Sequence, residues 1–177
     1  MALADIAAAQ QRVVAVLHKR PGAGRQADTP ARVRWDGALR SRAIRPDGSE
    51  IALDMPAEIG GGGAGVTPGW LLRSALASCA VTRIAMLAAT EGLVLTTLEA
   101  EATSRSDARG LLGLTEADGR AVPAGPDDVQ LHVRIGAPGV APERLRALVA
   151  ATVPLSPVTC ALASPIAVTM HVQVEGS

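Results

Sequence analysis

The 177-residue sequence lacks phenylalanine and tyrosine, and Trp35 and Trp70 are its only aromatic residues. Proteins that bind single-stranded nucleic acid stack the bases on aromatic rings, and this chain has almost none to offer. The formal net charge is zero, and no basic stripe is present. We therefore expect neither a nucleic acid nor a membrane surface as a partner.

Targeting and metal signals are also missing. The first residues carry Asp5 early and no basic segment, which predicts no signal peptide and a cytoplasmic protein. The three histidines and two cysteines form no close pairs, so we predict no metal site and no cofactor. The nucleophile-elbow motif of α/β-hydrolases, Gly-x-Ser-x-Gly, is absent, so the sequence gives no support for a hydrolase of that class. In a reducing compartment, Cys79 and Cys160 are expected to be reduced or redox-active rather than a permanent disulfide.

What is present predicts one α+β domain. Apolar residues make up 48% and charged residues 19% of the chain, which is typical of a globular protein. Residues 1–30 predict an appended amphipathic helix and a linker, and residues 31–177 a single domain. Alternation of period two predicts strands at about 31–36, 38–45, 50–53, 93–104, 129–135 and 166–174, and helices are expected at 142–153 and 156–164. The strands follow one another through turns, and the helices are separate from them in the sequence, which favours the α+β class.

The longest predicted element is a helix between Thr67 and Gly92. Thr67 is a good N-cap, Pro68 suits the first helical position, and Gly92 is a natural stop. Apolar residues cover almost every face, which predicts a buried core helix rather than a membrane span, because it also contains two arginines. Cys79 lies at its centre.

A glycine-rich loop, residues 55–66, precedes this helix. Gly60, Gly62 and Gly65 satisfy the pattern G-x-G-x-x-G, but dinucleotide binding also requires a parallel βαβ unit and an acidic residue about 20 positions further on. The strands before the loop are predicted to form hairpins instead. We therefore expect a loop that leads into the helix.

The two cysteines have different local settings. Cys160 lies in the first turn of a helix that starts at Ser156, where the helix N-terminus favours a thiolate. Cys79 is mid-helix, so a reactive thiolate there would need an arginine: Arg83 four residues on, or Arg40 or Arg42 on the second strand. The alternative is that both cysteines are small buried residues without chemistry.

Two motifs resemble those of the OsmC/Ohr family of thiol-dependent hydroperoxide-reducing proteins. The first is PAEIGGGGAGVTPGWLLRSALASCAVTRIAMLAATEGL, which is similar to the family's Glu-Leu-Gly-Gly loop, Asn/Thr-Pro helix start and mid-helix cysteine. The second is SPVTCALASPIAVTMHV, where the family has a cysteine heading a late helix. The proline that usually follows that cysteine is Ala161 here. The resemblance spans roughly residues 31–175.

This resemblance implies an OsmC-like fold: antiparallel sheets around a long buried central helix that carries Cys79, in an intertwined homodimer with each site at the interface. It implies that Cys79 is the peroxidatic thiol and Cys160 the resolving thiol in the reduction of an organic hydroperoxide, with an external dithiol as reductant. Arg40, Arg42 or Arg83 would stabilise the thiolate, and Arg40 is predicted to be catalytic together with the two cysteines. The substrate pocket is expected to contain Leu72, Leu76, Trp70 and Arg83.

The sequence departs from the peroxidase members at two positions. Gly69 stands where they carry a glutamate after the helix-start proline, and Leu39, beside Arg40, stands where they carry an arginine. The resemblance therefore predicts a peroxidase of low activity. The alternative is a non-catalytic OsmC-like dimer that binds a small apolar ligand, with structural cysteines.

Overall fold

The computed structural model describes residues 3–164 and 166–176. An N-terminal helix and a 3₁₀ turn lead to three strands: α1 (Leu3–Lys19), η1 (Pro21–Gly24), β1 (Arg32–Gly37), β2 (Arg40–Ile44) and β3 (Glu50–Leu53). The middle of the chain contains η2 (Ala57–Ile59), α2 (Pro68–Thr90), β4 (Thr97–Arg105), α3 (Ala108–Leu111) and β5 (Asp127–Gly136). The chain continues through α4 (Pro142–Thr152), η3 (Val153–Leu155) and α5 (Pro157–Ala163). Both sheets are antiparallel, with strand orders β1-β2-β3 and β4-β5, so the predicted mixture of helices and antiparallel sheets is confirmed.

The central helix α2 begins and ends where the sequence predicts. The Thr67 hydroxyl accepts a hydrogen bond from the Trp70 N–H at 3.1 Å, and Pro68 occupies the first turn. Gly92 follows the helix with a φ of +68°, a conformation that favours glycine at a helix end. Capping by the local sequence therefore fixes both ends of the element that carries Cys79.

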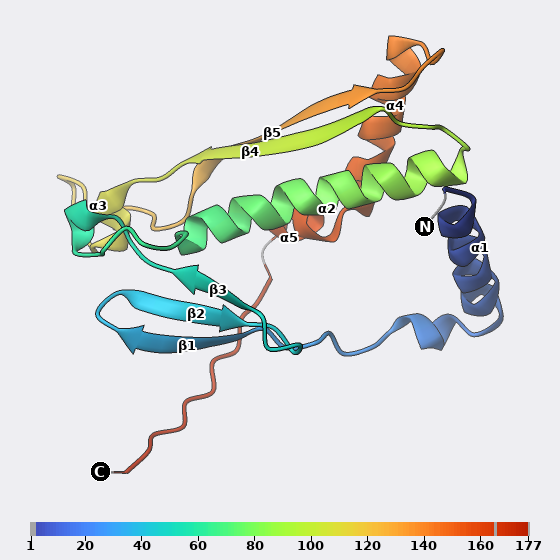
Figure 1. Cartoon of the computed structure of the whole chain (residues 1–177). Coiled ribbons are helices and arrows are strands. Elements are labelled where there is room, and N and C mark those ends of the chain that lie inside the picture. Colours follow the sequence, from blue (N-terminus) through green and yellow to red (C-terminus); the bar gives the residue numbers. More distant parts are fainter. Residues whose placement is uncertain (1–2, 165, 177) are drawn as a thin grey trace.

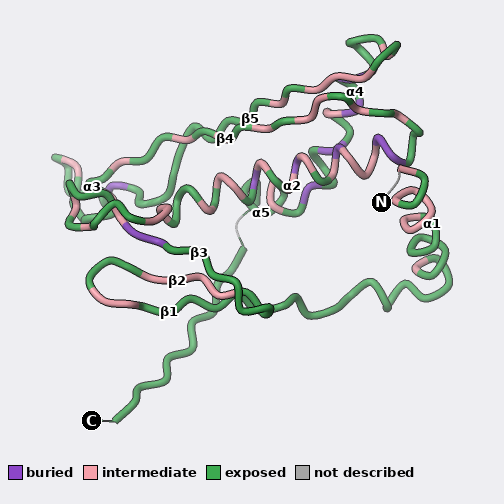
Figure 2. The backbone as a smooth tube through the Cα atoms, viewed as in Figure 1, coloured by how far each residue is buried: buried purple, intermediate pink, exposed green. Residues whose placement is uncertain are grey.

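One face of α2 forms the core. The β4–β5 hairpin lies along the helix, and α4 and α5 pack on it from another side (Figure 1). Ile84, Ala88 and Leu148 are buried at the centre of this packing, and apolar residues of β4 and β5 surround them. The core is concentrated in the C-terminal half of α2, as Figure 2 shows.

The opposite face of α2 is not buried in the single chain, which corrects the expectation of burial all round. Leu72, Ala75 and Thr82 are exposed, and they share a helix face because they are spaced by three and seven residues. By length and composition alone, α2 would qualify as a membrane span, and so would the bent pair of α4 and α5. The packing of β4, α4 and α5 on α2 is instead typical of a core helix.

The β1–β3 sheet packs little on the rest of the chain. It lies on the other side of α2 from the β4–β5 hairpin (Figure 1), and Val33, Trp35 and Ile51 on it are exposed. Monomeric proteins rarely leave several large apolar side chains of one sheet in water. This sheet is therefore a surface without a partner in the single chain.

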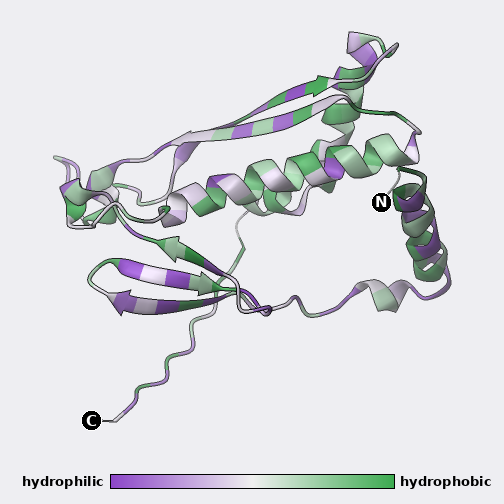
Figure 3. Cartoon of the chain, in the orientation of Figure 1, coloured by the Kyte–Doolittle hydropathy of each residue, from purple (hydrophilic) through white to green (hydrophobic). Residues whose placement is uncertain are grey.

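The predicted last strand, residues 166–174, is not a strand in the structure. Residues 166–176 run away from α5 without pairing with any strand (Figure 1). The expected alternation is present (Figure 3), yet Val168 is 91% exposed, and Ile166, Met170, Val172 and Val174 are also exposed. A strand requires a neighbour for its backbone hydrogen bonds, and the described part of the chain offers none here.

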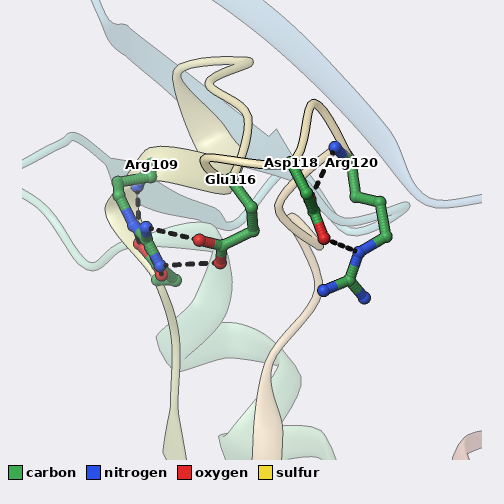
Figure 4. A network of polar contacts seen from close by, with 5 residues as sticks. Arg109, Glu116, Asp118 and Arg120 are labelled. Atoms are coloured by element: carbon green, nitrogen blue, oxygen red, sulfur yellow. Dashed lines mark hydrogen bonds and ion pairs between the residues drawn. The ribbon is translucent and has the colours of Figure 1, made fainter.

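The segment between β4 and β5 carries ion pairs on its surface. Arg109 lies between Asp107 and Glu116, and Arg120 pairs with Asp118 at 2.7 Å (Figure 4). All of these side chains are at least 39% exposed, so each pair contributes little to stability. We therefore interpret these ion pairs as contacts that shape the loop and not as part of a functional site.

Candidate functional site

The thiol of Cys79 is in contact with the residue that precedes α5. The Ser156 hydroxyl donates a hydrogen bond to Cys79 Sγ at an Oγ–Sγ distance of 3.2 Å. Ser156 is only 2% exposed, and Cys79 is half-buried. The contact joins residues 77 positions apart, so it exists only because α5 packs on α2.

A second hydroxyl supports this contact. Thr159 Oγ1 donates to Ser156 Oγ at 2.9 Å. Because the Ser156 oxygen accepts this proton, its own proton is directed at the sulfur. Ser156 stands at the N-cap of α5, yet its side chain makes no capping hydrogen bond, although serine at this position usually caps. The Ser156 hydroxyl therefore donates its hydrogen bond to Cys79 and does not cap α5.

Cys160 lies one turn further along α5. Its N–H donates to the Ser156 carbonyl at 2.9 Å, and its thiol donates to the Pro154 carbonyl at 3.5 Å. The side chain is exposed, and both cysteines are free thiols. The structure thus brings the element that carries Cys160 onto α2, but the group that meets Cys79 is the Ser156 hydroxyl.

Arg83 shares a helix face with Cys79 but makes its contact elsewhere. Its Nη1 donates to Met86 Sδ at 3.5 Å. Among the residues that the structure describes, its buried Nε has no hydrogen-bond partner. Such a group costs free energy, so Arg83 has unused donor capacity four residues beyond Cys79 on the same helix.

The arginines of the second strand lie in the β1–β3 sheet, away from Cys79. Arg42 is bound by Asp36 through two hydrogen bonds of 2.6 and 2.9 Å and by Glu50 at 3.0 Å. This pairing lowers the pKa of Asp36 and raises that of Arg42. Arg42 is therefore already neutralised by carboxylates.

Arg40 borders a cavity of about 260 Å³ within the same sheet. The other lining residues come from β1–β3 and the loop that follows, including Asp36 and Asp54. No residue of α2 lines this cavity, so the single chain does not bring Arg40 to Cys79.

The residues predicted to form an apolar pocket lie on two different faces of α2. Leu72, Leu76, Cys79 and Arg83 follow one another at helical spacing along one stripe. Trp70 lies about 160° around the helix from Leu72 at 3.6 residues per turn. It lines a cavity of about 390 Å³ between α2 and β4 with Arg73 and Glu101. Trp70 therefore does not share a pocket with Leu72 in the single chain, and Leu76 is buried in the core.

The family model for OsmC-like protein matches residues 60–171. The chain belongs to the OsmC-like family. The matched region contains α2 with Cys79, the β4–β5 hairpin, and α5 with Ser156 and Cys160. No curated protein sequence matches the chain significantly.

Solved structures share the fold of this OsmC-like chain. A Psychrobacter arcticus protein named for the osmotic stress and detoxification response is 25% identical, with a TM-score of 0.58 over 77% of this chain and 90% of that chain. An organic hydroperoxide resistance protein OsmC from Legionella pneumophila is 20% identical, with a TM-score of 0.56 over 77% and 91% of the two chains. The organic hydroperoxide resistance protein OhrB of Bacillus subtilis is 19% identical, with a TM-score of 0.52 over 78% and 94%.

Sequence reasoning missed Ser156 as a site residue. The signal was present: in the family motif the second cysteine precedes a proline, and here Ser156 precedes Pro157 at the start of a late helix. Among the described residues, no three His, Cys, Asp or Glu side chains cluster in a way that could hold a metal ion. The chemistry that the site can offer rests on a sulfur and the hydroxyl that contacts it.

Proposed function

We propose that the protein is a thiol-dependent peroxidase of low activity that reduces organic hydroperoxides at Cys79. The observation that supports this most directly is the Ser156–Cys79 hydrogen bond, because it gives a half-buried thiol a donor that favours the thiolate. The exposed residues beside Cys79 on α2 leave a route by which a peroxide can approach the sulfur.

In the first step the Cys79 thiolate attacks the terminal oxygen of ROOH. The O–O bond breaks, the alkoxide takes a proton and leaves as ROH, and the sulfur becomes a sulfenic acid. The sulfur is oxidised by two electrons and the peroxide is reduced by two. Arg83, the charged residue of α2 closest in sequence to Cys79, is the candidate cation within this helix for stabilising the charge on the leaving oxygen.

In the second step Cys160 is the candidate resolving thiol. Its sulfur would attack the sulfenic acid, form a disulfide and release water, and an external dithiol would then reduce the disulfide by exchange. This step requires the Ser156–Cys79 contact to open and α5 to rearrange. Helix α5 has seven residues and none of them is buried, so the buried group that has to move is Ser156 at its N-cap.

The active unit that we propose is a homodimer. The exposed β1–β3 sheet and the unpaired segment 166–176 are both apolar surfaces of a kind that a second copy would cover. Arg40 would then reach Cys79 from the second copy rather than from its own chain.

A single-turnover experiment tests the proposed function. Reduced protein is mixed with one equivalent of cumene hydroperoxide, the alcohol released is quantified, and the cysteines are mapped by mass spectrometry. We expect alcohol formation that is lost in Cys79→Ser, a bond between Cys79 and Cys160 in the unmodified protein, and a trapped sulfenic acid in Cys160→Ser. Alcohol formation that is unchanged in Cys79→Ser would refute the peroxidase.

A second candidate function is supported by the absence of the family's charged pair. Gly69 and Leu39 replace its glutamate and arginine, and the hydrogen-bond donor to Cys79 is a hydroxyl rather than a guanidinium. An OsmC-like dimer that binds a small apolar ligand would need no such pair. Ligand binding that persists in Cys79→Ser, without peroxide reduction by the unmodified protein, would favour this candidate.

A further inference from the structure

The Ser156 hydroxyl occupies the place beside Cys79 that a second thiol would have to reach. It is buried, it stands at a helix start without capping that helix, and its donor distance to Cys79 Sγ is 3.2 Å. We propose that Ser156 is a positioning residue that holds the Cys79 sulfur in a reactive orientation and stabilises its thiolate. The contact and its effect on the sulfur do not depend on the proposed peroxidase function. Only the effect of Ser156 on peroxide reduction rests on that function.

The direction of the hydrogen bonds follows from the second hydroxyl. Thr159 donates to Ser156 at 2.9 Å, so the Ser156 proton is left to point at the sulfur. A donor that is buried and already oriented stabilises a negative sulfur without reorganising during the reaction. Thr159 thus fixes the direction in which Ser156 donates.

No charged group competes for this role within α5 or on the near part of α2. Residues 157–163 contain no charged side chain. Arg83 is the charged residue of α2 closest in sequence to Cys79, and its Nη1 is directed at Met86. The hydrogen bond that orients the sulfur therefore comes from an uncharged donor.

The hydroxyl also has a chemical consequence. Serine cannot form a disulfide with an oxidised Cys79, so the sulfenic acid formed there is not consumed by its immediate neighbour. It persists until α5 rearranges or an external thiol arrives. Ser156 thus separates the oxidation of Cys79 from its resolution, whereas a cysteine at this position would join the two steps.

The test compares two substitutions of equal size. Ser156→Thr retains a hydroxyl and Ser156→Val does not, and both add the same bulk to a buried site. Both are made in a Cys160→Ser background, so that alkylation by iodoacetamide at neutral pH reports Cys79 alone. We expect Ser156→Val to react about tenfold more slowly than Ser156→Thr, as expected for the loss of a hydrogen bond to a charged group. Equal rates in the two folded variants would overturn the proposal.

A third variant tests the contact itself. In the same background, Ser156→Cys places a thiol where the hydroxyl lies, and oxidised glutathione should close a disulfide between positions 79 and 156, releasing two equivalents of glutathione. A folded variant that forms no such bond would contradict the contact. Alkylation and disulfide closure need no peroxide, so these results stand or fall separately from the peroxidase assay.

Discussion

Asp54 shows how one residue organises the glycine-rich loop that leads to α2. Its carboxylate is buried and accepts hydrogen bonds from the N–H groups of Met55 at 2.8 Å, Gly62 at 3.1 Å and Ala64 at 3.2 Å. These bonds lower the pKa of Asp54, the Met55 bond most, and the nearby Arg40 adds to the effect. The loop is therefore tied to the end of β3, and it packs so closely there that a Cβ at Gly61 or Gly65 would clash with the backbone of residues 52–55.

We predict that Asp54→Asn lowers the melting temperature by several degrees, because an amide presents an N–H group where backbone N–H groups already point. The pKa of Asp54 in the folded protein lies below its ordinary value of 3.8. Its contribution is thus present above pH 4 or so and is lost as the pH falls further through the folded pKa. Calorimetry at neutral and acidic pH should show the difference between the variant and the unmodified protein shrinking in acid.

Asp118→Asn is the matched control for this prediction. Asp118 also has a lowered pKa, but it pairs with Arg120 at the surface of the β4–β5 excursion. A surface pair contributes little, so its loss should leave the melting temperature nearly unchanged. Equal effects of the two substitutions would show that Asp54 does not hold the loop.

At the scale of elements, the sequence predicts best what its local chemistry determines. Thr67, Pro68 and Gly92 mark α2, and turn signals mark the β1–β3 sheet: the signal at residues 36–37 lies just before the observed turn at 38–39, and the signal at 46–48 coincides with a turn. Each of these signals acts over a few residues, so no tertiary information is needed to interpret them. The class of the fold follows from them.

What the sequence does not predict depends on contacts between distant segments. The Ser156–Cys79 contact spans 77 positions and arises from the packing of α5 on α2. Helix geometry alone places Trp70 and Leu72 on different faces of α2. Which of the two faces a cavity depends on the packing of β4, and β4 lies on the side of Trp70. Residues 166–174 have the alternation of a strand, yet pairing depends on a neighbour that alternation cannot reveal.

We predict that the C-terminal half of α2 is the segment most protected from hydrogen exchange. Ile84 and Ala88 are fully buried there, and exchange at such sites requires large-scale opening. Residues 104–126 are mostly exposed and should exchange orders of magnitude faster. Exchange followed by mass spectrometry on peptides from both segments measures this. Similar rates would mean that α2 is not the centre of the core.

At the scale of the whole molecule, the exposed apolar surfaces predict self-association. Val168 and Val172 occupy one side of the C-terminal segment, and both are largely exposed. Light scattering should give about twice the 18.0 kDa of one chain at micromolar concentration. The double substitution Val168→Lys and Val172→Lys should shift the mass toward one chain, because a charged side chain on a buried strand face is costly.

The control for this experiment lies on the other side of the same segment. Thr169→Lys and Gln173→Lys add the same charge at alternate positions, whose side chains point to the opposite face of an extended chain. We expect this variant to keep the mass of the unmodified protein. Dissociation of both variants alike would indicate an effect of charge and not of the apolar face.

The last prediction concerns the rate, which depends on residues from two parts of the molecule. Gly69 lies in the first turn of α2, and an added Cβ would meet Arg73 Nη1 at 3.5 Å and Thr67 Oγ1 at 3.9 Å, which are ordinary contacts. A glutamate therefore fits at this position, and its negative charge suits a helix N-terminus. Alone, however, it would pair with Arg73 four residues on. Leu39 lies between β1 and β2 and is 46% exposed, so an arginine also fits there.

We therefore expect Gly69→Glu alone to change peroxide reduction little, and Gly69→Glu with Leu39→Arg to raise the single-turnover rate toward the roughly 10²–10³-fold that one preorganised electrostatic group can supply. The matched control is Gly69→Gln with Leu39→Arg, which keeps the size of the side chain and removes its charge. Stopped-flow measurements with cumene hydroperoxide compare the three variants. If the charged and uncharged double variants are equally fast, no ion pair is acting, and the low activity has another cause. The lysine substitutions at Val168 and Val172, combined with the charged pair, show whether the acceleration requires a dimer. If it does, Arg40 and its neighbour at position 39 reach Cys79 across the interface.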